Sequence, residues 1–136
     1  LEAAEVAMRR GLMTAMGAPN AMRGQSYSGN LSAREAHAHG MLSILAADYH
    51  PAAILPAIRS LAETDPEGLV GAARLATANP ARALGLTDRG RIEPGLRADL
   101  VAVDHRDRVV LTLSRGEVVH SNGVLRDHGR PLRTVA

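Results

Sequence analysis

The sequence feature that most constrains the fold is the apolar run Leu42–Ala47, which ends abruptly at Asp48 and is followed by Pro51. An apolar run of this length, bounded by Gly40 and Pro51, is typical of a strand buried on both faces. A carboxylate at the carboxyl end of such a strand lies at the mouth of a parallel sheet, where α/β proteins place their catalytic groups. Asp48 is therefore the first candidate for a functional residue. The alternative is that Asp48 only caps the following helix, since Asp is a favoured N-cap residue.

The segments before this run predict alternating helices and strands. Residues 1–10 have apolar positions at helical spacing, and residues 12–16 form a second apolar segment that is closed by a turn at residues 17–20. Ser32 and Glu35 match a capping box, which opens another helix. Helices and strands that alternate in this order imply parallel strands joined by crossover connections.

Prolines predict where the later helices begin. Pro51 suits the first position of a helix that runs towards Glu63, and Pro56 inside this helix predicts a late start or a kink. The pairs Asp65–Pro66 and Asn79–Pro80 each combine a capping residue with a first-turn proline. We therefore expect two more helices, one that runs to about Thr77 and a short one that stops at Gly85.

The chain changes character after Thr87, where short β-type runs replace the helical patterns. Asn122 and Gly123, flanked by strand residues, are the strongest hairpin signal in the sequence. We expect a small antiparallel sheet within residues 87–136 and a separate α/β part within residues 1–86. The predicted strands are Leu100–Val103, Val109–Leu113, Val118–His120 and Val124–Leu125.

The segment Arg23–Asn30 is too polar and too rich in glycine for a regular element, so it predicts a loop. Arg23 can form a bidentate pair with phosphate oxygens, and Ser26 and Ser28 can donate hydroxyl hydrogen bonds. The loop also leads to the N-terminus of the helix after Ser32, where anions bind readily. On residue types alone, an ordinary surface turn is the favoured interpretation.

Composition excludes several classes of partner. All 16 basic residues are Arg, the formal net charge is only +2 and the aromatic content is 1%, so we expect no nucleic-acid partner. Cys is absent, which excludes disulfides and thiolate metal ligands and is compatible with a reducing compartment. No apolar run approaches membrane-spanning length, and no charged leader precedes a hydrophobic core. We expect a cytoplasmic protein without a membrane partner.

Three stretches resemble a known superfamily. NPARALGLTDRGRIEPGLRADLVAVD, at residues 79–104, resembles the end of amidohydrolase-superfamily enzymes, where a helix after the last barrel strand leads into a small β-sandwich. MGAPNAMRGQSYSGNLSA (residues 16–33) and LSILAADYHP (residues 42–51) resemble the branch of that superfamily that serves phosphonate metabolism in the carbon–phosphorus lyase pathway. Gln25 and Tyr27 depart from the Gly and His expected in this branch.

The resemblance implies an α/β fold. Residues 1–86 would be the C-terminal part of a (β/α)8 TIM-like barrel, with its last two strands and helices, and residues 87–136 an antiparallel β-sandwich segment. The implied activity is that of a metal-dependent diphosphatase, which releases pyrophosphate from α-D-ribose 1-methylphosphonate 5-triphosphate. The His-x-His pair of the family and its other metal ligands would lie outside this chain, so we expect the isolated chain to be inactive.

The resemblance also assigns roles to individual residues. Asp48 matches the aspartate that ends the eighth barrel strand, which binds the catalytic metal and takes the proton from the attacking water. Asp48 is therefore expected to be both catalytic residue and metal ligand, with zinc as the expected divalent metal. Phosphate binding becomes the favoured interpretation of the loop, with Arg23, Ser26, Ser28 and Asn30 as substrate-binding candidates.

His37 and His39 also form a His-x-His pair, but we do not expect them to bind the catalytic metal. Residues two apart in a helix point to different sides and cannot share one ion.

Two other interpretations of the whole chain stay open. One is a different amidohydrolase that acts on a C–N bond, and the other is a non-catalytic module for folding or association. We expect the two predicted parallel strands not to stand alone, because a two-stranded sheet is marginal. The expected partners are a phosphorylated small molecule and either a second copy or the missing N-terminal part of the same enzyme.

Overall fold

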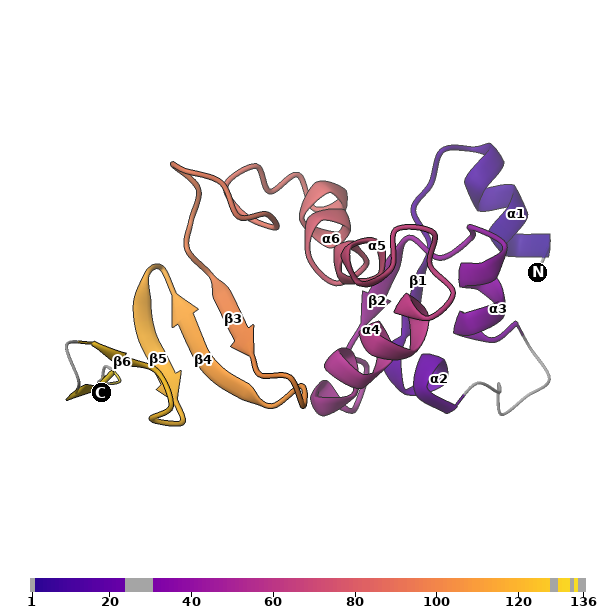
Figure 1. Cartoon of the computed structure of the whole chain (residues 1–136). Coiled ribbons are helices and arrows are strands. Elements are labelled where there is room, and N and C mark those ends of the chain that lie inside the picture. Colours follow the sequence, from indigo (N-terminus) through magenta and orange to yellow (C-terminus); the bar gives the residue numbers. More distant parts are fainter. Residues whose placement is uncertain (1, 24–30, 128–129, 133, 135–136) are drawn as a thin grey trace. The chain divides into compact units, whose positions relative to one another are not determined.

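The computed structural model describes residues 2–23, 31–127, 130–132 and 134. The chain divides into two compact units, Leu1–Gly90 and Arg91–Ala136, and Figure 1 shows that helices belong to the first and antiparallel strands to the second. The fold is thus mixed α/β, with a small parallel sheet and small antiparallel sheets. The interpretation of the two units as barrel and sandwich stays a prediction.

The first unit contains a parallel pair of short strands, β1 (Ala15–Gly17) and β2 (Ile44–Ala46), as the alternation of elements predicts. In their register Ala15 lies opposite Ile44 and Gly17 opposite Ala46. Thr14 fixes the start of this register, because its carbonyl oxygen accepts hydrogen bonds from Ser43 N at 3.1 Å and Ile44 N at 2.8 Å. The helices of the unit are α1 (Glu2–Arg9), α2 (Ala18–Arg23), α3 (Ala33–Ala38), the 3-10 helix η1 (Pro51–Ala53), α4 (Ile54–Ala62), α5 (Leu69–Arg74) and α6 (Ala78–Ala83).

Small side chains build the core of this unit. The sequence has no Phe or Trp, and alanines from α2, α3, α4 and α5 are fully buried, so these helices can approach closely. Leu61 of α4 is the largest side chain that is fully buried, and Leu45 of β2 is 3% exposed. The cluster consists of Ala18, Ala21, Ala33, Ala36, Met41, Leu42, Leu45, Ala53, Ala57, Ile58, Leu61, Ala72 and Leu75.

The free edge of β2 is partly covered by the end of α5. The backbone N–H of Leu45 donates a hydrogen bond of 2.8 Å to the carbonyl oxygen of Leu75, which directly follows α5. This N–H is on the side of β2 that does not face β1, since alternate residues of a strand point their amides to opposite neighbours. An element from later in the chain therefore satisfies an edge group that a two-stranded sheet would leave open.

The start signals of two helices are confirmed. Ser32 caps α3, and its hydroxyl oxygen accepts a hydrogen bond of 3.1 Å from Glu35 N. After Asp48, the one helix expected from Pro51 begins as η1 and becomes α-helical only at Ile54, which places Pro56 in the first turn of α4. This is the late start that Pro56 predicts, because proline in a first turn breaks no helical hydrogen bond.

Other boundaries differ from the prediction. The predicted turn at residues 17–20 is wrong, because α2 begins at Ala18 and takes Pro19 into its first turn, where proline is tolerated. The strand before Asp48 is short, and its Ala46 is exposed, so β2 is not buried on both faces along its length. α6 begins at Ala78, and the Asn79 side chain donates a 2.9 Å hydrogen bond to Ser43 O instead of capping the helix.

The second unit contains the predicted antiparallel sheet. β3 (Leu100–Val103), β4 (Val109–Ser114) and β5 (Glu117–Ser121) pair in that order, and Arg115 and Gly116 make the turn between β4 and β5 with φ of 54° and 84°. The predicted hairpin at Asn122–Gly123 is wrong, because β6 (Arg126–Asp127) pairs with β7 (Arg130–Pro131) and not with β5.

Within the described residues, no helix is long and apolar enough to cross a membrane.

Candidate functional site at the carboxyl ends of β1 and β2

Asp48 lies two residues beyond the carboxyl end of β2, and it is exposed. Its φ is 57°, in the left-handed region that few residues other than Gly adopt and in which Asp is enriched. The hydrogen bond of 3.2 Å from His50 N to Ala47 O closes a tight turn around it. The turn therefore fixes the direction in which the Asp48 side chain leaves the backbone.

The Asp48 side chain turns back over the end of the neighbouring strand. Gly17 ends β1, and a Cβ atom placed on Gly17 would lie 2.8 Å from Asp48 Oδ2, 3.3 Å from its Cβ and 3.4 Å from its Cγ. Gly17 is also opposite Ala46 in the parallel register. The carboxylate thus lies at the carboxyl ends of both strands, the position at which α/β proteins carry their chemistry.

The capping interpretation of Asp48 is wrong. The N-cap position of η1 is His50, and no side chain makes a cap hydrogen bond there. Among the described residues, none donates a hydrogen bond to the Asp48 carboxylate or forms an ion pair with it. With no such partner among the residues that the structure describes, the carboxylate is available for a ligand, although its catalytic and metal-binding roles stay predictions.

The described residues do not form a complete metal site. No group of three or more His, Asp or Glu side chains comes together among them in a way that could hold a metal ion. Asp48 can supply one oxygen ligand of the kind that zinc accepts, but a zinc site takes three or more protein ligands. The part of the chain that the structure describes therefore supplies one ligand of a metal site, Asp48, and not a complete ligand set.

The predicted phosphate loop falls mostly outside the described residues. Arg23 is the last residue of α2, but its side chain is not among the described groups, and Ser26, Ser28 and Asn30 lie outside the described residues altogether.

The described residues on both sides of that segment are tied together. Asn20 Oδ1 accepts a hydrogen bond of 3.1 Å from Ala33 N, at the start of α3. Arg34 of α3 donates from Nε to Ala21 O at 2.8 Å and from its terminal nitrogen to Met22 O at 3.3 Å. These contacts hold the end of α2 against the start of α3. They could not be predicted from the sequence, in which Asn20 and Arg34 are only two polar residues.

His37 takes part in a buried pair and not in a His-x-His site. Its Nε2 lies 3.2 Å from Asp65 Oδ2, and the two side chains are only 9% and 8% exposed. His37 Nε2 makes no hydrogen bond, so the contact with Asp65 is a close pairing of the two groups. His39 is exposed in the C-cap position of α3, which agrees with the expectation that the two imidazoles point apart.

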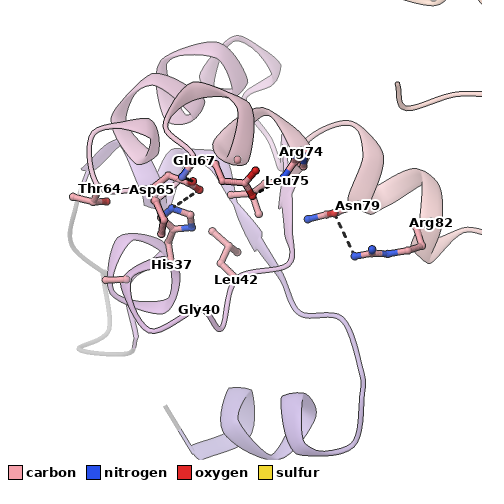
Figure 2. Close-up of a pocket in the computed structure, with 13 residues that line it drawn as sticks. His37, Gly40, Leu42, Thr64, Asp65, Glu67, Arg74, Leu75, Asn79 and Arg82 are labelled. Carbon is pink, nitrogen blue, oxygen red and sulfur yellow. Dashed lines mark hydrogen bonds and ion pairs between the residues drawn. The ribbon is translucent and has the colours of Figure 1, made fainter. Parts of the chain in front are cut away.

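A pocket of about 520 Å³ opens beside this pair (Figure 2). Gly40 and Leu42, which precede β2, line it, and Asp48 does not, so the pocket begins at the other end of the strand from the candidate carboxylate. Both pocket arginines have partners, since Arg74 pairs with Glu67 at 2.6 Å and Arg82 contacts Asn79 Oδ1 at 3.4 Å. The pocket is therefore separate from the Asp48 site and offers no concentration of unpaired charge.

Comparison of the sequence with known families defines the class of protein. The model of the amidohydrolase family matches residues 2–121, and the chain belongs to that family. Of individual proteins, the chain is similar to the α-D-ribose 1-methylphosphonate 5-triphosphate diphosphatase of Escherichia coli strain K12, with 46% identity over 108 residues. Those residues are 78% of this chain but only 29% of the relative, so the chain spans less than a third of that protein's length.

Shorter segments of the chain are similar to other proteins. The adenine deaminase of Methanothrix thermoacetophila is 44% identical over 64 residues, which are 47% of this chain and 11% of that protein. The imidazolonepropionase of a Ruegeria species is 58% identical over 41 residues, 30% of this chain and 9% of that protein.

Proposed function

We propose that this chain is the C-terminal portion of a metal-dependent phosphoanhydride hydrolase that releases pyrophosphate from α-D-ribose 1-methylphosphonate 5-triphosphate. The observation that carries the proposal is the exposed Asp48 carboxylate at the ends of two parallel strands, in a chain that is 46% identical over 108 residues to such a diphosphatase. The remainder of the barrel and the other metal ligands would come from parts of the protein beyond this chain.

In this proposal Asp48 acts through its two carboxylate oxygens. One oxygen would hold the divalent metal, with zinc expected, and a bound metal would supply acidification of water towards neutral pH. The other oxygen would accept the proton of the attacking water, which is general-base chemistry. The left-handed turn directs the Asp48 side chain to the mouth of the sheet, so that the proton would be accepted there.

Arg23, Ser26, Ser28 and Asn30 are proposed to bind the triphosphate. The contacts of Asn20 and Arg34 support this, because they hold the two ends of that segment together and so limit where it can go. A guanidinium and two hydroxyl groups are suited to phosphate oxygens.

The similarity to the adenine deaminase and the imidazolonepropionase favours a second candidate, a hydrolase of a C–N bond. In that case Asp48 would have the same role, so its substitution alone does not separate the two activities. The choice of substrate separates the two activities. The full-length enzyme should therefore be assayed for pyrophosphate release from the ribose triphosphate and for ammonia release from adenine.

The decisive variant is Asp48→Asn in the full-length enzyme. The amide keeps the shape of the side chain but loses the charge and the basicity, so kcat should fall about 100- to 10,000-fold and the metal content should fall with it. Metal analysis and steady-state kinetics on the same preparation measure both effects. Near-normal turnover with full metal content would show that Asp48 has neither role.

The third interpretation, a non-catalytic module, is tested with the isolated chain. A metal titration should show no stoichiometric tight site, because Asp48 supplies one ligand only. Tight binding of one ion per chain would mean that the chain carries a complete site of its own.

A further inference from the structure

Gly17 is in contact with the candidate catalytic residue, although it carries no side chain. It ends β1 next to Ala46 of β2, and the Asp48 carboxylate occupies the space that a side chain at position 17 would fill. A Cβ on Gly17 would approach Asp48 Oδ2 to 2.8 Å, and real Cβ atoms essentially never come within 3.0 Å of another heavy atom. Any residue larger than Gly would therefore displace the carboxylate.

Rotation of the Asp48 side chain does not remove every contact with a side chain at position 17. Rotation about χ1 would move Oδ2, but the Cβ of Asp48 would stay 3.3 Å from the added atom, a separation tighter than nine in ten real contacts. The Asp48 backbone is held in the left-handed region by the turn from Ala47 to His50. On the other side, the pairing of β1 with β2 fixes Gly17. Relief of the clash thus requires rotation of the carboxylate and a further shift of a few tenths of an ångström at the Asp48 Cβ.

We infer that Gly17 is a positioning residue for Asp48: its missing side chain lets the carboxylate lie across the ends of both strands. The steric part of this inference stands on the distances alone, and its catalytic consequence rests on the proposed function. Gly17 has no left-handed φ, so its need for glycine comes from the space that Asp48 takes and not from backbone strain.

The inference predicts how Gly17→Ala alters the full-length enzyme. An added methyl group forces the carboxylate away by a few tenths of an ångström or more, and misplacements of about 1 Å can cost about 100-fold in rate. We expect kcat to fall about 10- to 100-fold while KM stays nearly unchanged, because the triphosphate contacts are made elsewhere. The thermal unfolding midpoint should also fall by about 2–10 °C, as for other overpacked sites.

A double-mutant cycle in thermal stability distinguishes two causes of a loss on Gly17→Ala. One is the contact with Asp48, and the other is any effect of alanine on β1 that does not involve Asp48. Asp48→Gly removes all three atoms that meet the new methyl group, and glycine suits the left-handed φ of 57°. If the contact is the cause, Gly17→Ala lowers the midpoint in the natural protein and leaves it nearly unchanged in the Asp48→Gly background. An equal loss in both backgrounds overturns the inference. If Gly17→Ala fails to fold alone, recovery of folding in the Asp48→Gly background decides the same point.

The kinetic measurement then separates the inference from the proposed function. Coupled stability with unchanged kcat for Gly17→Ala would show a packing contact without a positioning role, and so overturn the inference. Normal turnover of Asp48→Asn would overturn the proposed role of Asp48 itself, whatever the cycle shows. Coupled stability together with a fall in kcat at constant KM supports Gly17 as a positioning residue.

Discussion

Asp48 shows how much of a candidate site can be predicted from a residue type and from the residues that bound the strand before it. The apolar run and Pro51 locate a carboxylate at a strand end, and the structure has Asp48 exposed there. The left-handed backbone of Asp48 and its approach to Gly17 could not be predicted, since both depend on how the end of β1 meets the turn after β2. Non-glycine residues in this region of φ often mark functional sites, because the surrounding structure has to hold them there.

Arg23 provides a prediction at the same scale. Arg23→Ala in the full-length enzyme should lower kcat/KM for the triphosphate substrate about 10- to 100-fold, because a hydrogen bond between charged groups is lost. Metal content should not change, in contrast to Asp48→Asn. Arg9→Ala is a matched control, since Arg9 is an exposed arginine of α1 paired with Glu5 at 4.0 Å. Equal effects of the two substitutions would argue against a specific role for Arg23.

At the scale of elements, the start of a helix was predictable where the capping side chain bonds to its own helix. The prediction was wrong where that side chain contacts another element. Ser32 caps α3 through a hydrogen bond from Glu35, three residues away. Both partners of the cap are therefore visible in the sequence motif. Asp65 is different: its Oδ1 accepts a hydrogen bond of 2.8 Å from Glu67 N, and its Oδ2 contacts His37 of α3. With Asp65 used in this way, α5 begins only at Leu69, after Gly68 with its φ of 60°.

The His37–Asp65 pair predicts that neutralising two nearby carboxylates, Asp65 and Glu67, lowers the stability by different amounts. Asp65→Asn keeps an acceptor for Glu67 N but removes the charge opposite His37 in a buried place, and it should cost about 1–3 kcal/mol of stability. Glu67→Gln is the control, because its pair with Arg74 is about half exposed and such pairs contribute about 0–1 kcal/mol. Thermal unfolding of both variants measures the difference. A loss for Asp65→Asn no larger than that for Glu67→Gln would show that the buried pair is not stabilising.

The turn between β3 and β4 predicts a dependence on pH. The Arg108 side chain, which donates from Nε to Asp104 Oδ2 at 2.8 Å, is the largest cause that lowers the pKa of Asp104 from 3.8 to about 2, and backbone hydrogen bonds from Arg108 and Arg106 add to it. The folded pKa is below the unfolded one, so the stabilisation is fully present above pH 3.8 and is lost as the pH falls through about 2.

Asp104→Asn should therefore abolish the part of the pH dependence of stability that arises in this window. An NMR titration of the Asp104 side-chain carbonyl carbon gives the pKa directly. A midpoint at or above the ordinary value of 3.8 would contradict the prediction.

At the scale of the molecule, the short β-type runs after Thr87 predicted the antiparallel sheet. The alternation of helices and strands earlier in the chain predicted the parallel pair. The hairpin at Asn122–Gly123 failed because a turn sequence does not determine which strands pair. Asn122 Oδ1 accepts a hydrogen bond of 3.0 Å from Val124 N, and this local turn leads β6 away from β5.

The register of the second unit predicts how it associates. Leu111 lies opposite Ala102 and Ser121, whereas Thr112 lies opposite Val101 and His120, so the two neighbours point to opposite faces of the sheet. We expect the chain to self-associate through the more apolar Leu111 face, and Leu111→Glu should shift it towards monomer in sedimentation velocity. Thr112→Glu on the opposite face is the control and should leave association unchanged. A wild-type chain that is monomeric at all concentrations would rule out this surface.

The hydrogen bond from Leu45 N to Leu75 O has a kinetic consequence. A strand that adds to this edge of β2 has to compete for a donor that is already engaged, so the end of α5 must move away first. Association limited by such an opening has an observed rate that rises with the concentration of the incoming strand and then reaches a plateau at the opening rate. The end of α5 would then act as a gate on the edge of β2, and the height of that plateau would measure how often the gate is open.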